Sequence, residues 1–200
     1  MKKLIALMLA VMMLAALAAC GRQAAPAVGG WTPAEGADMT EDAQAAFDKA
    51  MEGFVGVNYV PVALLATQLV SGMNYCILCE ATVVYPDARP YYALVYVYRD
   101  TQGKAEISRI LPIDLGDVAE SGEIREAEPA GEALMGAWTV DRASSVELKG
   151  ALMHLASQVV SGKNHCVLCE GNELVFVYEN LEGKTEVTGR VAIDVAGLAG

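Results

Sequence analysis

Five cysteines are the residues whose chemistry is easiest to infer from this sequence. Four of them form two C-x-x-C pairs, Cys76 with Cys79 and Cys166 with Cys169. Two such pairs at this spacing are typical of zinc sites. The residues between the cysteines are Ile-Leu and Val-Leu, which favour strands over the tight turn of a zinc knuckle. On a regular strand, residues i and i+3 point to opposite faces, so a pair can share a metal or a local disulfide only across a bulge.

The fifth cysteine, Cys20, follows a segment with the features of an export signal. Lys2 and Lys3 give the segment a positive start, and residues 4–16 form an uninterrupted apolar stretch. That stretch is shorter than the about 20 residues that span a bilayer core, and its length is typical of a signal peptide. The thiol at its end is a side chain that can form a thioether with lipid.

The residues Leu-Ala-Ala-Cys at 17–20 resemble the lipobox of bacterial lipoproteins. The resemblance implies cleavage before Cys20 and covalent diacylglycerol on its thiol, with palmitate among the acyl chains. Two acyl chains anchor a protein stably, whereas a single chain is marginal. We therefore predict a signal peptide over residues 1–19, a linker over residues 20–28 and a protein that is lipid-anchored on the extracytoplasmic face of the cell membrane.

An extracytoplasmic location permits disulfides. We therefore predict that Cys76, Cys79, Cys166 and Cys169 are disulfide-bonded, either within a bulged strand or between the two pairs. A second interpretation is that they are buried free thiols that act as small apolar residues. A third is that they bind a metal, although we assign no metal ligands.

Catalytic chemistry has little support in this sequence. The two histidines are His154 and His165, and there is neither a serine elbow nor a glycine-rich phosphate loop. The formal net charge is -11, and it becomes -13 without the two lysines of the signal peptide. No basic stripe offsets this charge, which excludes nucleic acid as a partner. We predict no enzymatic activity, no catalytic residues and no cofactor apart from the diacylglycerol on Cys20.

An internal duplication organises the rest of the chain. Residues 66–80 and 156–170 are identical at ten of fifteen positions, and residues 93–107 resemble residues 174–187. The segments GGWT and GAWT precede them in the same order. We predict a first copy over residues 29–117, an acidic linker over residues 118–135 and an abbreviated second copy over residues 136–200.

The length difference between the copies matches residues 40–56, which have the pattern of a helix. Thr40 is a suitable N-cap, Glu41 and Asp42 suit the helix dipole, and apolar residues recur at helical spacing. The second copy lacks this segment, although residues 146–158 are open to interpretation as a shorter helix. Strands are predicted over residues 59–70, 74–85, 91–99 and 105–113, which are rich in Val, Ile, Leu and Tyr.

This order of elements, with QLVSG between two strands, resembles the cystatin family. The Q-x-V-x-G motif of that family matches Gln68, Val70 and Gly72, and it matches again at Gln158, Val160 and Gly162. The resemblance implies an α+β fold in which one helix packs on an antiparallel β-meander, followed by a shortened, mostly β second copy. It also places Gly29 and Gly30 in the glycine-containing N-terminal trunk of the family.

In cystatins the trunk and the Q-x-V-x-G hairpin enter the cleft of papain-like cysteine proteases. The resemblance therefore implies a protein-binding edge at these residues and a papain-like cysteine protease as a possible partner. The chain departs from the family at the second hairpin, where DTQGK at 100–104 contains neither Pro nor Trp. The alternatives are that QLVSG only forms the turn of the hairpin, that the protein has a structural or assembly role in the cell envelope, and that it is a metal-binding module.

Overall fold

A computed structural model describes residues 29–128 and 136–200. The predicted signal peptide, Cys20, the 20–28 linker and part of the acidic linker lie outside these residues. None of the helices in the described part of the chain has the length and apolar character needed to cross a membrane.

The first copy forms a five-stranded antiparallel sheet in which neighbouring strands are consecutive in sequence. Its strands are β1 (Trp31–Pro33), β2 (Val57–Leu69), β3 (Gly72–Val83), β4 (Tyr91–Asp100) and β5 (Ala105–Ile113). The four strands predicted from the sequence are confirmed to within two residues at each end. The predicted strands are long and apolar, which explains why their positions were accessible from sequence.

The second copy forms a five-stranded sheet with the same order of strands and has no counterpart of the helix at residues 41–50 among its described residues. Its strands are β6 (Thr139–Val140), β7 (Ala151–Val159), β8 (Lys163–Cys169), β9 (Glu173–Glu179) and β10 (Thr185–Ala192). Bulges fall at matching places in the two sheets. In the bulges of the last strands, the hydroxyls of Ser108 and Thr188 donate to the carbonyls of Tyr96 and Phe176.

The predicted fold class, an α+β fold with one helix on a meander, is wrong. Strands make up 48% of the described residues and helices 13%, and they form two sheets of five strands each. The physical reason is that each sheet buries an apolar face against the other sheet, so the largest core is a sheet-on-sheet core. The sequence pattern predicted the strands but not which element covers each face of the sheet. The helix was predicted to be the main layer packed on the sheet, whereas it covers only one outer face.

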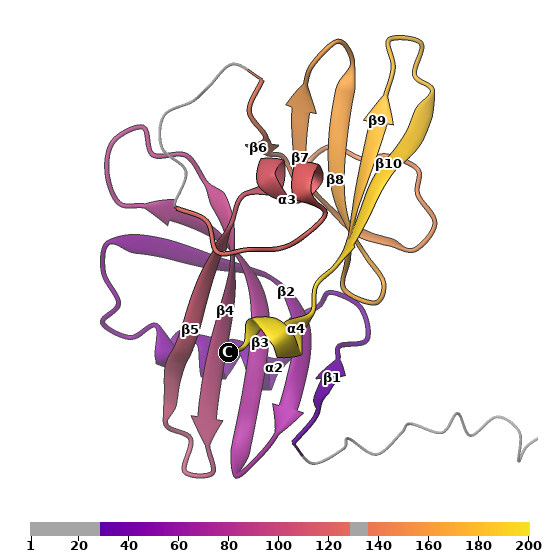
Figure 1. Cartoon of the computed structure of the whole chain (residues 1–200). Helices are drawn as coiled ribbons and strands as arrows, with labels where there is room; N and C mark the ends of the chain where they lie inside the picture. Colours follow the sequence, from indigo (N-terminus) through magenta and orange to yellow (C-terminus); the bar gives the residue numbers. More distant parts are fainter. Residues whose placement is uncertain (1–28, 129–135) are drawn as a thin grey trace, which may run out of the picture.

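Strand β4 shows how this arrangement is built. Every residue from Tyr91 to Val97 is buried, because both faces of this central strand are covered. Leu94 and Tyr96 point into the core between the sheets, whereas Val95 and Val97 point to the outer face of the first sheet. Figure 1 shows the two sheets, with the first copy in indigo to magenta and the second in orange to yellow.

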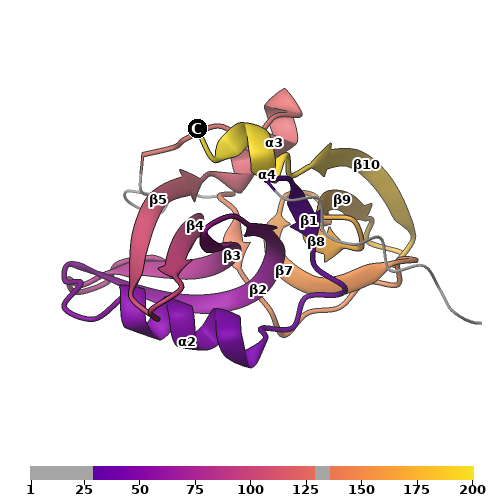
Figure 2. The ribbon, with the colours of Figure 1, turned by 90° about the horizontal axis from the view of Figure 1, so that it is seen from below.

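The outer face of the first sheet is covered by α2 (Glu41–Ala50), as Figure 2 shows from below. Thr40 caps this helix by accepting a hydrogen bond from the backbone N–H of Ala43, 3.2 Å away. Ala46 and Phe47 are buried in the cluster on this face. The predicted helix is therefore present over the first part of its predicted range, although it covers only one outer face.

The two copies are also joined by hydrogen bonds across the core. The Tyr92 hydroxyl donates to the Leu155 carbonyl, and the Asn172 amide, at the matching position of the second copy, donates to the Leu65 carbonyl; both distances are 2.9 Å. The short helix α3 (Leu115–Ser121) follows the first sheet, and α4 (Val195–Leu198) follows the second.

Each short helix contacts the sheet of the other copy. Gly116 of α3 lies against Trp138, and the hydroxyl of Tyr96 donates to the Val195 carbonyl at the start of α4, 3.1 Å away. Figure 1 shows α4 lying over the first sheet. The two copies therefore form one unit with a shared core.

Candidate functional site

The glutamines of the Q-x-V-x-G motifs hold the first strand of each copy in place. The side-chain amide of Gln68 donates to the Gly29 carbonyl at 2.9 Å and accepts a hydrogen bond from Asn74 at 2.6 Å. In the second copy, Gln158 donates to the Gly136 carbonyl at 2.6 Å and accepts from Asn164 at 2.8 Å. The same pair of bonds in both copies shows that Gln and Asn lock the start of each sheet to its hairpin.

The glycines of the motifs are required by close backbone approach. A Cβ atom on Gly72 would lie 2.3 Å from the Arg99 carbonyl oxygen, and one on Gly162 would lie 2.6 Å from the Glu179 carbonyl oxygen. Gly162 has a positive φ of 140°, whereas Gly72 does not have a positive φ. At both positions a side chain would collide with the neighbouring strand.

The predicted protein-binding residues therefore separate into two groups. Gln68, Gly72, Gln158 and Gly162 make internal contacts, as does Gly29, whose N–H donates to the Leu69 carbonyl at 3.0 Å. Gly30 lies beside Gln68. Val70 and Val160 lie at the hairpin tips and expose 36% and 47% of their surface.

The cysteines of each C-x-x-C pair lie on opposite faces of one strand, as the strand periodicity predicts. Cys76 and Cys166 belong to the core between the sheets, whereas Cys79 and Cys169 belong to the outer-face clusters. All four are buried free thiols, so the disulfides that we predicted are absent from the structure. Burial raises the pKa of Cys76 to about 12, which keeps this thiol protonated and unreactive.

The two histidines, by contrast, meet in a buried hydrogen-bonded chain on the outer face of the second sheet. His154 on β7 and His165 on β8 expose only 7% and 1% of their surface. Nε2 of His154 lies 2.9 Å from Nδ1 of His165, and Nε2 of His165 lies 3.0 Å from Oε2 of Glu179 on β9. Nδ1 of His154 contacts the backbone carbonyl of Asp141. We call this set, from the Asp141 carbonyl to Glu179, the histidine chain.

The acceptor at one end fixes the proton positions along the histidine chain. A carbonyl only accepts, so Nδ1 of His154 carries a proton. Burial lowers the pKa of His154, which keeps the ring neutral and leaves its Nε2 as an acceptor for the Nδ1–H of His165. The Nδ1–H of His165 is thereby directed to His154, and the other ring nitrogen of His165 faces the carboxyl group of Glu179.

Asp141 also holds the segment that follows it. Its carboxylate accepts from the hydroxyl of Ser144 at 2.6 Å and from that of Ser157 at 3.0 Å, and the ammonium of Lys163 lies 3.6 Å away. The hydrogen bond from Ser144 is the largest cause that holds the pKa of Asp141 well below its ordinary value of 3.8. Because both hydroxyls donate to this carboxylate, the described residues place no serine nucleophile on the histidines.

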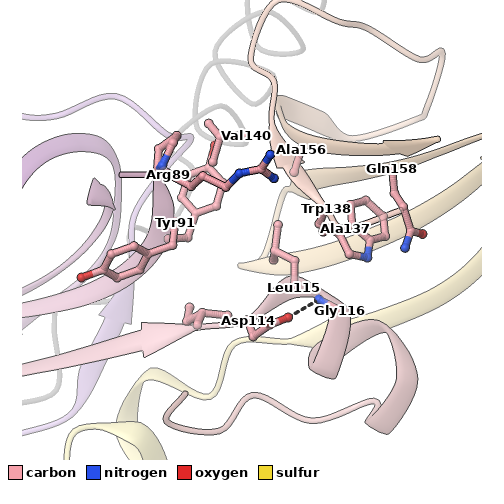
Figure 3. Close-up of a pocket in the computed structure, with 13 residues that line it drawn as sticks. Arg89, Tyr91, Asp114, Leu115, Gly116, Ala137, Trp138, Val140, Ala156 and Gln158 are labelled. Atoms are coloured by element: carbon pink, nitrogen blue, oxygen red, sulfur yellow. Dashed lines mark hydrogen bonds between the residues drawn. The ribbon is translucent and has the colours of Figure 1, made fainter. Parts of the chain in front are cut away.

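A cleft lined by residues of both copies lies between the two sheets. Its volume is about 310 Å³, at the low end of the range for small-molecule sites. Figure 3 shows its lining, in which Arg89 reaches from the loop before β4 toward β6 and β7, while Trp138, Leu115 and Gln158 form other walls. Asp114 lies at the opposite side of the cleft, where it caps α3.

Sequence reasoning did not identify the histidine chain or the cleft. The alignment of the two copies held one signal for the chain, because His154 and His165 replace Leu64 and Tyr75 of the first copy at matching strand positions. Two adjacent strands that both gain a histidine on one face suggest a paired site. Arg89 carried no comparable signal, because its role depends on contacts between the copies.

Comparisons with known proteins identify neither a family nor a relative for this chain. No family model matches the chain, and neither the curated proteins nor the solved structures contain a match.

Proposed function

We propose that this chain is a lipid-anchored extracytoplasmic protein that binds a partner protein through the hairpin tips of its second copy. The observation that carries the proposal is the exposure of three aliphatic side chains there, which is 90% for Leu181, 74% for Val159 and 47% for Val160. Val159 and Val160 lie at the tip of the β7–β8 hairpin, and Leu181 lies in the turn of the β9–β10 hairpin. Exposed apolar patches mark interaction sites. We call these three residues the tip patch.

The two hairpins that carry the tip patch are neighbours and are internally braced. Lys163, which pairs with Val159 across the first hairpin, also pairs with Glu179 on β9. In the second hairpin, Oδ1 of Asn180 accepts from the backbone N–H groups of Glu182 and Lys184, both at 2.9 Å. A braced tip loses little conformational entropy on binding, which favours affinity.

The position of the chain entry favours the second copy as the binding end. Gly29 is bonded to the β2–β3 hairpin of the first sheet, and the hairpin ends of the two sheets lie at opposite ends of the molecule (Figure 1). The predicted anchor at Cys20 is only nine residues before Gly29. The first hairpin is therefore held near the membrane, whereas the tip patch can face away from it.

The net charge of -11 favours a partner with a basic surface around an apolar groove. The corrected fold removes the reason to prefer a papain-like cysteine protease, so the proposal is for a protein partner in general. No catalytic step is proposed, because the polar groups of the histidine chain and of Asp141 are engaged with one another.

Site-specific photocrosslinking in cells that export the full chain tests this proposal. A photoreactive residue at Leu181 should give a discrete product with one partner, and the substitution Val159→Ser should reduce its yield. The matched control is Val55, which is 84% exposed at the other sheet and should give no such product.

No product at Leu181, or the same product at Val55, contradicts the proposal. The purified chain is also added to papain at micromolar concentration: inhibition that is lost in Val160→Asp identifies a cysteine protease as the partner class. Absence of inhibition together with a crosslink leaves a different protein partner.

A further inference from the structure

One wall of the cleft between the sheets comes from a segment of the first copy that the second copy lacks. Residues 84–90 join β3 to β4, whereas residues 170–172 make the corresponding connection between β8 and β9. Arg89 and Pro90 of the longer segment form one wall of the cleft. At the matching position of the other copy, Asn172 sits against Leu65 with no such wall. The insertion therefore makes this part of the first copy different from the matching part of the second.

Arg89 is distinctive among the arginines. Within residues 29–128 and 136–200, each of the others forms an ion pair: Arg99 with Asp42, Arg109 with Glu126, Arg125 with Glu123, Arg142 with Glu80 and Arg190 with Glu173. In a strongly acidic protein, a guanidinium that forms no ion pair with the described residues is available for an external anion. Its five donors match the two oxygens of a carboxylate.

The remaining walls define the body of the ligand. Apolar and aromatic side chains from both copies line the cleft, including Tyr92, Ile113, Leu115, Trp138 and Val140. The ring of Trp138 is fixed by an edge-to-face contact with Phe176, at a centroid distance of 5.6 Å. Such a surface favours a compact apolar or aromatic group.

Asp114 limits the charge that the cleft accepts. Its Oδ1 accepts from the backbone N–H groups of Gly116 and Asp117, at 2.7 and 3.1 Å, so this carboxylate is held in place as a helix cap. It lies across the cleft from Arg89 (Figure 3). A second negative charge on a ligand would be repelled from this side.

We propose that the cleft binds a monocarboxylate with a compact apolar or aromatic body, whose carboxylate pairs with Arg89 and whose body lies against Trp138 and Leu115. Free organic acids and the C-terminal carboxylate of a peptide that ends in an apolar residue share this chemistry. This site is separate from the tip patch, and it does not depend on the proposed protein partner.

Calorimetric titration of the full chain in lipid nanodiscs tests the site. The probes are phenylacetate, its neutral isostere phenylacetamide, the dianion phenylmalonate and a short peptide that ends in Phe, as free acid and as amide. Phenylacetate should bind at least roughly tenfold more tightly than phenylacetamide, because a charge-assisted pair is lost in the amide. Phenylmalonate should bind more weakly than phenylacetate.

The decisive variant is Arg89→Met, which keeps the apolar stem and should lower the affinity for phenylacetate at least roughly tenfold without changing thermal stability. The matched control is Arg142→Met, which removes a half-exposed arginine outside the cleft and should leave binding unchanged. Equal binding of acid and amide, undiminished binding by Arg89→Met, or no heat from any probe at millimolar concentration overturns the proposal. Tighter binding of the peptide acid than of phenylacetate assigns the site to chain termini, and the reverse assigns it to free acids.

Discussion

The outer faces of the two sheets start from the same strand pattern and are covered in different ways. On the first sheet, Leu64 and Tyr75 lie beneath α2, in an apolar cluster that includes Phe47. On the second sheet, the matching positions are His154 and His165, and residues 141–150 contain no helix. Val146 and Leu148 of that segment cover part of the face.

The comparison shows that the face of a sheet can be covered in two different ways. An amphipathic helix supplies apolar contact over its whole length. A short irregular segment supplies less apolar contact, and the histidine chain joins it to the sheet through hydrogen bonds that have to be satisfied. We expect the first face to depend on packing and the second on polar pairing and pH.

The largest effect is expected from the helix anchor. Phe47→Ala should lower the free energy of unfolding by about 3–5 kcal/mol, because Phe47 is only 3% exposed and its loss leaves a cavity. Leu148→Ala, on the covering segment of the second sheet, should cost clearly less because Leu148 is only partly buried. Urea denaturation of the two variants gives the comparison. Equal costs would mean that the irregular segment is as strongly packed as the helix.

The histidine chain should show a smaller but coupled effect. His154→Leu leaves the Nδ1–H of the buried His165 without its acceptor, and should cost about 1–3 kcal/mol of unfolding free energy. The double variant His154→Leu with His165→Tyr restores the residues of the first copy and should cost less than the sum of the single changes. A double-mutant cycle measures this coupling. Additive costs would show that the two rings act independently.

The pH dependence should come from the second sheet. Burial lowers the pKa of His154 below its ordinary value of 6.5, so the unfolded chain binds more protons than the folded one as the pH falls through 6.5. The free energy of unfolding should therefore decrease below about pH 6.5, because a protonated His154 would turn a donor toward the Nδ1–H of His165. The lowered pKa of Asp141 adds a further decrease below pH 3.8.

Unfolding measured from pH 8 to pH 5 tests this prediction. The double variant His154→Leu with His165→Tyr serves as the control and should lose the decrease near pH 6.5. An unchanged profile in that variant would assign the effect to other groups.

The smallest effect is expected at the start of α2. Thr40→Ala removes the cap of the first turn and should cost about 1 kcal/mol. The exposed Thr101 in the β4–β5 turn is the matched control, and Thr101→Ala should be nearly neutral. A neutral Thr40→Ala would indicate that contacts of Phe47 alone hold the helix.

Much of the local structure could be predicted from the sequence. The strands of the first sheet have long runs of Val, Ile, Leu and Tyr, and the helix over residues 41–50 has its cap and its apolar spacing in the sequence. The duplication placed the hairpins of the second copy. The opposite faces of Cys76 and Cys79 followed from strand periodicity alone.

The fold class could not be predicted in the same way, because an apolar strand face does not reveal which layer covers it. The resemblance to cystatins implied that the helix covers this face. It also implied that the Q-x-V-x-G motif binds a partner protein. In the structure, Gln68 and Gln158 are internal braces, which a hairpin motif does not distinguish from an exposed edge. Disulfides were predicted for the four cysteines, which are free thiols in the structure. An extracytoplasmic location permits disulfides, but it does not bring two sulfur atoms close together.

The sequence by itself determined the periodic elements, the repeat and the acidic charge of this protein, because each depends on residues that are near one another in the chain or on composition. Tertiary structure decided that the two sheets face each other, that His154, His165 and Glu179 form one chain, and that Arg89 faces Trp138 across a cleft. Pairing of β7, β8 and β9 within the second sheet brings the members of the histidine chain together, whereas Arg89 and Trp138 meet because the two sheets pack face to face. The lipid anchor predicted at Cys20 rests on local sequence alone and stays a prediction.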